Sequence, residues 1–245
     1  MAGPGFFGRH SNVYTYVPNL IGYARVAAAL YAFGVAFKSP YQCIIAYFLS
    51  FVCDELDGRF ARMLNQTSTL GAVLDMVTDR LATTGLLIIV SLVYPQIHTL
   101  CIALVFLDIF SHWFQMYASL ALGATTHKDV RSKSGLVRLY YSNRVFMGYC
   151  CICCEVLYLV IYASMWPGVM GIALPLPNGV RLELPARVLE VAPVLERFLV
   201  PSGVSIMTIL GIAALPGFFT KQICNWVQLR TAADQLIAVD AQKKK

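Results

Sequence analysis

The stretch DELDGRFARMLNQTSTLGAVLDMVTD, residues 54–79, is the most unusual part of this chain. It gathers four acids in a protein that is 58% hydrophobic and only 13% charged. The acids are Asp54, Asp57, Asp75 and Asp79. Carboxylates in apolar surroundings are costly, and ionisable residues in membrane segments usually have a function. The stretch is therefore the first candidate for a functional site.

The spacing within this stretch predicts two helices with acidic faces. The first helix face carries residues at steps of three, one, three and one, which are Asp54, Asp57, Gly58, Ala61 and Arg62. Gly71, Asp75 and Asp79 step by four and share a second face. The polar segment MLNQTSTL, residues 63–70, is short enough to turn the chain. Two antiparallel helices would then bring the four carboxylates to one place.

Four close carboxylates repel one another, so cations are expected among them. A ligand set without Cys or His favours two Mg2+ or Mn2+ ions over zinc, with Asp54, Asp57, Asp75 and Asp79 as ligands. Gly58 and Gly71 would let a bulky ligand approach the backbone, and Arg62 is a donor for phosphate oxygens. The pattern predicts phosphoryl-group chemistry on two metals. The alternative is a pair of helix ends whose acids merely face water.

Written as D-x-x-D-G-x-x-A-R-x8-G-x-x-x-D-x-x-x-D, the stretch resembles the complete signature of the CDP-alcohol phosphotransferase family of membrane enzymes. The flanks resemble the branch of that family that makes phosphatidylinositol. The segments that carry this second resemblance are VPNLIGYARV, LNQ, GAVLDMVTDR, LDIFSHW, THK, VRLYYSNR and the KKK tail. The family resemblance covers most of the chain. Residues 168–200 depart from it and resemble an insertion.

The resemblance implies a homodimeric enzyme of the endoplasmic reticulum or Golgi. It would transfer the phosphatidyl group of CDP-diacylglycerol to myo-inositol, giving phosphatidylinositol and CMP. The last acid of the signature corresponds to the proton acceptor, which makes Asp79 the expected base. No Cys, Ser or His is set up as a nucleophile, so a one-step displacement is expected. The residues expected to bind CDP-diacylglycerol are Gly58, Ala61, Arg62, Ser68, Thr69 and Gly71.

The acceptor pocket is expected to offer several hydrogen-bonding side chains, because inositol is neutral and rich in hydroxyls. Lys128, Arg138 and Arg144 are assigned to it, partly because THK and VRLYYSNR resemble the inositol branch. Asp108 and His112 lie four residues apart on one helix face and are added as further members. They could equally form a purely structural pair.

Composition predicts an all-α, polytopic membrane protein that forms a single domain over residues 1–245. The mean hydropathy is +0.65, and a helix needs about 20 apolar residues to cross a bilayer core of about 30 Å. The expected transmembrane helices are 16–37, 41–62, 70–94, 97–122, 144–166 and 199–226. The C-terminal run is expected to leave the last of these six as an amphipathic extension. Residues 1–15 lack the pattern of a signal peptide, so the first helix is expected to act as its own signal.

Lys and Arg predict the orientation of these helices. With a cytosolic N-terminus, fourteen fall on the cytosolic side: Arg9, Arg59, Arg62, Arg80, Lys128, Arg131, Lys133, Arg138, Arg144, Lys221, Arg230, Lys243, Lys244 and Lys245. The other side holds four: Lys38, Arg181, Arg187 and Arg197. The acidic stretch is therefore expected to face the cytosol. The connection 167–200 is expected to be lumenal, with a surface helix at VLEVAPVLERF.

Other polar residues fit this interpretation, and other functions are less well supported. Arg25 and Glu155 are expected to be structural partners of other helices, and the eight cysteines to be packing residues. The sequence has no basic patch with interleaved aromatic residues, so it does not indicate nucleic acid binding. Three alternatives stay open: a family member using glycerol phosphate, serine or choline, an intramembrane prenyltransferase, and an ion-coupled transporter. The prenyltransferase would need a second acidic motif, and the transporter would need acids near the bilayer midplane.

Overall fold

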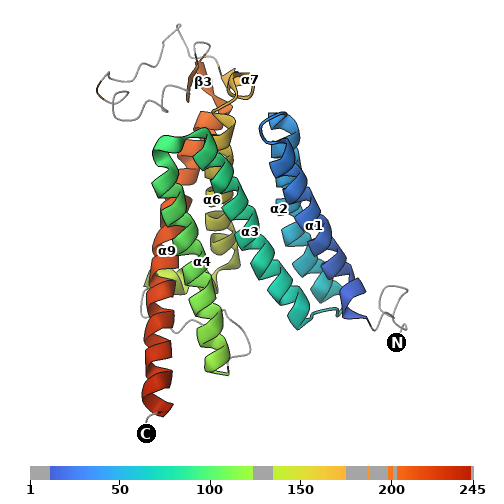
Figure 1. The fold of residues 1–245 in the computed structure, drawn as a ribbon, viewed down its shortest axis with the longest axis vertical. Coiled ribbons are helices and arrows are strands. Elements are labelled where there is room, and N and C mark those ends of the chain that lie inside the picture. The colour runs from blue at the N-terminus through green and yellow to red at the C-terminus, as the bar shows by residue number, and fades with distance from the viewer. Residues whose placement is uncertain (1–11, 124–134, 175–186, 188–197, 201–202, 244–245) are drawn as a thin grey trace. The chain divides into compact units, whose positions relative to one another are not determined.

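The computed structural model describes residues 12–123, 135–174, 187, 198–200 and 203–243 (Figure 1). Nearly all of the described residues are helical, which confirms the all-α prediction. The long helices are α1 (Val17–Val35), α2 (Pro40–Met63), α3 (Thr69–Val93), α4 (His98–Ala121), α6 (Arg144–Ala163) and α9 (Ile206–Lys243). The short helices are η2 (Val13–Thr15), η3 (Pro95–Ile97), α5 (Gly135–Ser142) and α7 (Pro167–Met170).

Each of the six expected transmembrane helices corresponds to one long helix. Among the described residues, four are long and apolar enough to cross a membrane: Thr69–Val93, Pro95–Ala121, Arg144–Ala163 and Ile206–Ala241. α1 and α2 are not among them. Asn19 and Arg25 interrupt the apolar sequence of α1, and α2 ends in the charged signature. The six-helix membrane topology therefore stays a prediction.

The last helix differs from the expected one at both ends. It begins at Ile206 and not at residue 199, because the preceding residues form strands. β3 (Gly203–Ser205) pairs antiparallel with β1 (Ala173–Leu174) and β2 (Leu199–Val200), in the order β1-β3-β2. The C-terminal extension is not separate: α9 continues for 38 residues, through Pro216, to Lys243. Most of the expected surface helix at VLEVAPVLERF lies outside the described residues.

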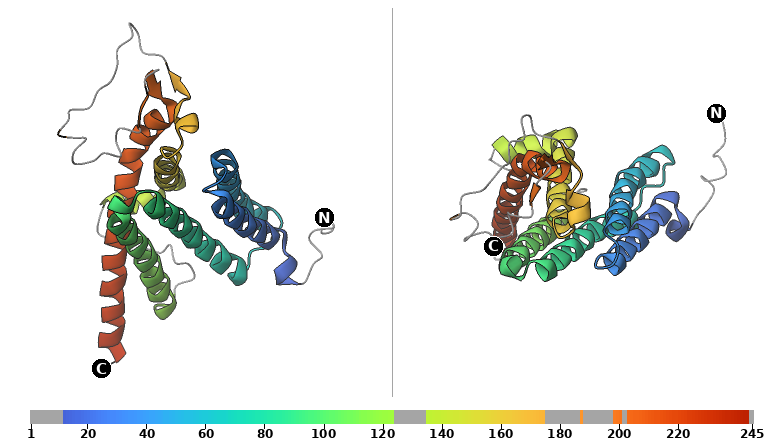
Figure 2. Two further views of the ribbon diagram at one scale, coloured as in Figure 1. Left: turned by 45° about the horizontal axis from the view of Figure 1, so that its top comes forward. Right: turned by 90° about the horizontal axis from the view of Figure 1, so that it is seen from above.

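The chain divides into two compact units, Met1–Ile89 and Val90–Lys245. In the first, α1 and α2 pack side by side, as both views of Figure 2 show. Most of α3, up to Ile89, also belongs to this unit. In the second, α4 and α6 pack against α9, and α5 contacts α6 and α9. The single membrane domain expected from the sequence stays a prediction.

A tight turn joins α2 to α3, as the polar segment predicted. Asn65 takes a left-handed backbone conformation, with a φ of 54°, which asparagine tolerates better than most residues. The N–H of Gln66 then donates to the carbonyl of Ala61 at 2.9 Å, closing the end of α2. Ser68 caps α3, because its Oγ accepts a hydrogen bond from the N–H of Gly71 at 2.9 Å. The turn also contacts α1: Gln66 Oε1 accepts from the N–H of Val17 at 2.9 Å.

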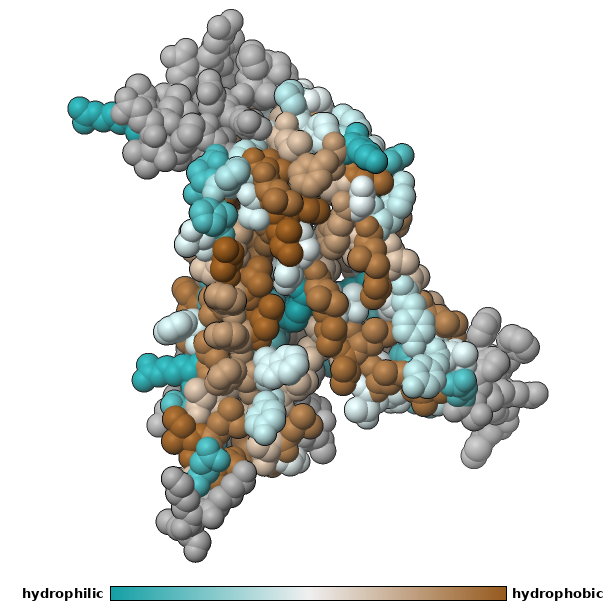
Figure 3. Space-filling model, in the orientation of Figure 1, coloured by the Kyte–Doolittle hydropathy of each residue, from teal (hydrophilic) through white to brown (hydrophobic). Residues whose placement is uncertain are grey.

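Large apolar side chains are exposed along the helices of both units. Leu30 on α1, Ile45 on α2, Trp113 on α4 and Trp226 on α9 are each more than half exposed. Brown, apolar residues accordingly cover much of the face drawn in Figure 3. A soluble protein rarely exposes so much contiguous apolar surface, so these faces fit contact with lipid.

Candidate active site

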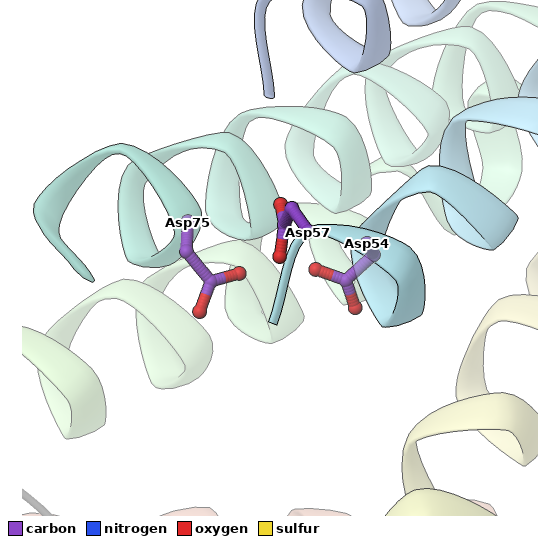
Figure 4. A group of neighbouring side chains, drawn as sticks. All are labelled: Asp54, Asp57 and Asp75. Atoms are coloured by element: carbon purple, nitrogen blue, oxygen red, sulfur yellow. The ribbon is translucent and has the colours of Figure 1, made fainter. Parts of the chain in front are cut away.

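Three of the four signature carboxylates form a compact group in the first unit. Asp54 and Asp57 come from α2 and Asp75 from α3, and their carboxylates turn toward one another (Figure 4). One oxygen from each lies within 4.8 Å of the others. The helical spacing predicted this convergence, and the structure confirms it for these three acids. A group made only of carboxylate oxygens suits a hard divalent cation, so these residues could hold a metal ion.

Asp79 lies one helical turn beyond Asp75 and is not part of that group. Its Oδ1 pairs with Nη2 of Arg25, and its Oδ2 lies 3.7 Å from Nη2 of Arg80. The structure therefore separates Asp79 from the group of three, although Arg25 contacts Asp54 and Asp75 as well as Asp79. The expectation that Asp79 also binds metal stays a prediction.

Arg25 was expected to be a structural partner of other helices, and its ion pairs with α2 and α3 confirm this. It projects from α1 with only 4% of its side chain exposed. Its Nη1 lies 2.6 Å from Oδ1 of Asp54 and 3.3 Å from Oδ1 of Asp75, while Nη2 pairs with Asp79. The expectation did not name these partners, which are the signature acids. The available signal was a single charge inside an otherwise apolar helix.

An open pocket with a cavity volume of about 170 Å³ lies beside the carboxylates. Asp57 and Asp75 form part of its wall. The residues expected to bind CDP-diacylglycerol that also line it are Gly58, Ala61, Arg62, Ser68 and Gly71. Thr69 is not among the lining residues. The wall residues that were not foreseen are Pro18, Asn19, Gln66, Thr67, Ala72 and Leu74.

Asn19 gives this pocket an unused hydrogen-bond acceptor. The residue is 1% exposed, and its Nδ2 donates to the carbonyl of Val13 at 2.6 Å. Its Oδ1 is buried without a hydrogen-bond partner among the described residues. Buried polar groups are rarely left unpaired, so a donor on a bound ligand fits this position. The available signal was an asparagine near the start of an apolar helix.

The two glycines in the pocket differ in the space around them. A Cβ on Gly58 would meet only the guanidinium of Arg62, 3.4 Å away, so the helix surface there is open. A Cβ on Gly71 would lie 2.8 Å from Asn19 Oδ1 and 3.1 Å from Ser68 Oγ. Gly71 therefore permits the close approach of α3 to Asn19.

The residues assigned to the acceptor belong to the second unit. His112 Nδ1 lies 3.5 Å from Asp108 Oδ1, so the pairing on one face of α4 is as predicted. α9 adds two residues that were not foreseen: Asn225 Nδ2 donates to Asp108 Oδ1 at 3.4 Å, and Lys221 Nζ donates to Asn225 Oδ1 at 3.0 Å. The two arginines of this set, Arg138 in α5 and Arg144 in α6, are exposed. Lys128 lies outside the described residues.

The fold and the site together define a helical protein with membrane-length helices and a carboxylate centre beside an open pocket. The model of the CDP-alcohol phosphatidyltransferase family matches residues 15–174, and the chain belongs to that family. A probable CDP-diacylglycerol–inositol 3-phosphatidyltransferase 2 of Arabidopsis thaliana is 42% identical over 95% of this chain and 94% of its own. The CDP-diacylglycerol–inositol 3-phosphatidyltransferase of Schizosaccharomyces pombe is 36% identical over 96% of this chain and 94% of its own. No solved structure matches the chain.

If the group of three acids holds metal, Asp57→Ala will weaken Mn2+ binding. The expected loss is about tenfold or more, because even residues that only support metal ligands change the affinity by that factor. Electron paramagnetic resonance of free Mn2+, titrated with detergent-purified protein, measures it. Glu55→Ala is the matched control, since Glu55 lies on the same helix but is exposed and pairs only with Arg59 among the described ion pairs. Equal Mn2+ affinity in the two variants would contradict the assignment.

If this pocket holds the nucleotide, Gly71→Ala will weaken nucleotide binding, because the added methyl group displaces Asn19 from the pocket wall. Losing one buried hydrogen bond to the ligand predicts a fall of about fivefold or more in CMP affinity. Calorimetric titration with CMP in the presence of Mn2+ measures this. Gly34→Ala on α1 is the control, since a Cβ there would meet nothing within 4 Å. An unchanged CMP affinity in the Gly71 variant would place the nucleotide elsewhere.

Proposed function

We propose that this protein transfers the phosphatidyl group of CDP-diacylglycerol to myo-inositol, producing phosphatidylinositol and CMP. The observation that carries the proposal is the carboxylate group of Asp54, Asp57 and Asp75 beside the pocket that Gly58, Arg62 and Gly71 line. These residues belong to the signature of a family in which relatives of this chain are named as inositol phosphatidyltransferases over nearly its whole length.

The pocket is assigned to the cytidine diphosphate part of the donor. Gly58 and Ala61 leave room for it on α2, and Arg62 supplies a guanidinium for phosphate oxygens. Asn19 Oδ1 accepts a hydrogen bond from the nucleotide. Two Mg2+ or Mn2+ ions, held by the signature acids, would neutralise the diphosphate and stabilise the departing CMP.

The acceptor reacts in one step. A hydroxyl oxygen of inositol bonds to the phosphorus atom that carries diacylglycerol, and the bond from that phosphorus to the CMP oxygen breaks. The hydroxyl proton passes to the carboxylate of Asp79. Arg25 and Arg80 fix the orientation of this carboxylate through its two oxygens. No residue of the chain needs to form a covalent intermediate.

The acceptor side is assigned to Lys128, Arg138 and Arg144, with Asp108 and His112. The hydrogen bonds that tie Asp108 to Asn225, and Asn225 to Lys221, extend this polar set onto α9. Polar residues among membrane helices are expensive unless paired or used. Inositol hydroxyls would add hydrogen bonds to those that Asp108, Asn225 and Lys221 already make with one another.

The enzyme is proposed to be a homodimer in the endoplasmic reticulum or Golgi membrane. Its active site would face the cytosol, because Lys and Arg flank the helices mainly on that side. The donor is a membrane lipid and the acceptor is water-soluble, so a site at the membrane surface gives both substrates access.

The deciding experiment is an acceptor panel. Purified full-length protein is supplied with CDP-diacylglycerol, Mn2+ or Mg2+, and labelled inositol, serine, glycerol phosphate or choline. Phosphatidylinositol should be the main product, and CMP should be released in equal amount. Preference for another acceptor would keep the family but change the branch, and the absence of any metal-dependent CMP release would overturn the function.

Asp79→Asn will abolish turnover while leaving measurable CDP-diacylglycerol binding, because the amide cannot accept the proton. General base catalysis predicts a fall in kcat of about a hundredfold or more. Asp234→Asn, at an exposed position on α9, controls for loss of a negative charge. Turnover close to that of the parent would remove Asp79 from this role.

Arg138→Ala and Arg144→Ala will raise the KM for inositol by about tenfold, the effect of losing a hydrogen bond from a charged donor. CDP-diacylglycerol affinity should change little. Arg230→Ala, also exposed, is the control for lost surface charge on α9. If both variants keep the inositol KM of the parent, the acceptor assignment is wrong.

A further inference from the structure

We propose that Arg25 is a built-in counter-ion of the carboxylate centre and that divalent metal ions compete with it for the same carboxylates. The proposal rests on the metal-dependent function proposed above. It assigns a role to a residue outside the signature stretch.

One guanidinium contacts three of the four signature acids. Nη1 lies between Asp54 Oδ1 at 2.6 Å and Asp75 Oδ1 at 3.3 Å, and Nη2 pairs with Asp79. Asp54 and Asp75 are also two of the three acids grouped closely enough to hold a metal ion. The same carboxylates therefore serve both the arginine and the candidate metal centre.

Arg25 is held at this place by its surroundings. Its side chain is 4% exposed, and Ser50 Oγ on α2 donates to its backbone carbonyl at 3.0 Å. Its Nε is buried without a hydrogen-bond partner among the described residues. A buried guanidinium nitrogen left unpaired is unfavourable, so the ion pairs at Nη1 and Nη2 must be what keeps the side chain in this position.

The charges explain why such a residue is useful. The four aspartates would carry four negative charges on two adjacent helices, and like charges at this range repel strongly where water is scarce. A planar guanidinium can bridge several carboxylates at once, which the ammonium of lysine does less well. Arg25 therefore keeps α2 and α3 assembled with α1 before any metal ion is bound.

The same contacts have an opposite effect on metal binding. A metal ion and a guanidinium at shared carboxylates repel each other and divide the same lone pairs. By linkage, the arginine weakens metal binding and bound metal weakens the arginine pairs by an equal factor. Arg25 thus stabilises the metal-free protein and lowers its affinity for divalent metal ions.

The test is Arg25→Gln in the full-length protein, which removes the charge and keeps a side chain of polar character. We expect its Mn2+ affinity to rise about tenfold, within the usual range of coupling between two sites. Its Tm in EDTA should fall below that of the parent, and the increase in Tm on adding Mn2+ should be larger. Electron paramagnetic resonance and thermal unfolding in detergent measure the two effects.

Two further variants make the result decisive. Arg59→Gln removes an exposed positive charge from α2 that pairs only with Glu55 among the described ion pairs, and its Mn2+ affinity should stay within about twofold of the parent. Arg25→Lys keeps the charge with fewer carboxylate contacts, so its affinity should lie between those of the parent and Arg25→Gln. It also serves if the glutamine variant does not fold.

The outcomes separate this inference from the transferase function. A lower or unchanged Mn2+ affinity in Arg25→Gln, or a lower one in Arg25→Lys, would overturn competition and leave Arg25 as a support for the metal ligands. Tighter Mn2+ binding in these variants, with no phosphatidylinositol formed by the parent, would uphold competition and refute the function. A parent that binds no Mn2+ would overturn the competition directly.

Discussion

The first unit must hold the negatively charged signature carboxylates of α2 and α3 close together although they repel one another. The ion pairs of Arg25 meet this constraint, because one side chain from α1 reaches acids on both α2 and α3. The packing of α1 against α2 and the bond from Val17 to Gln66 place Arg25 where it can do so. The site is therefore a product of three helices, although its signature lies on two.

The sequence predicted what depends on local rules. Helical spacing placed Asp54, Asp57 and Asp75 together, and the polar segment between the two runs predicted the turn. Both follow from a period of 3.6 residues and from turn chemistry over a few positions. The candidate site that these rules define, including most of the pocket wall on α2 and α3, could be recognised from the order of the residues alone.

What the sequence missed depends on contacts between distant segments. Arg25 lies 50 residues before Asp75 and 54 before Asp79 along the chain, and no periodicity links them. Asn19 enters the pocket for the same reason, through the packing of α1. The start of α9 was missed because the apolar residues before Ile206 were predicted to be helical, whereas Leu199–Val200 and Gly203–Ser205 form paired strands.

The length of α9 has a consequence for how this chain sits at a membrane surface. At 1.5 Å per residue, its 38 residues extend for about 57 Å, against a hydrocarbon thickness of about 30 Å. Even a strong tilt of about 40° leaves a projected length of roughly 44 Å. A helix of this length that crosses the bilayer must extend beyond the hydrocarbon into the headgroup layer and water, so a probe attached near its C-terminal end would report on the aqueous phase.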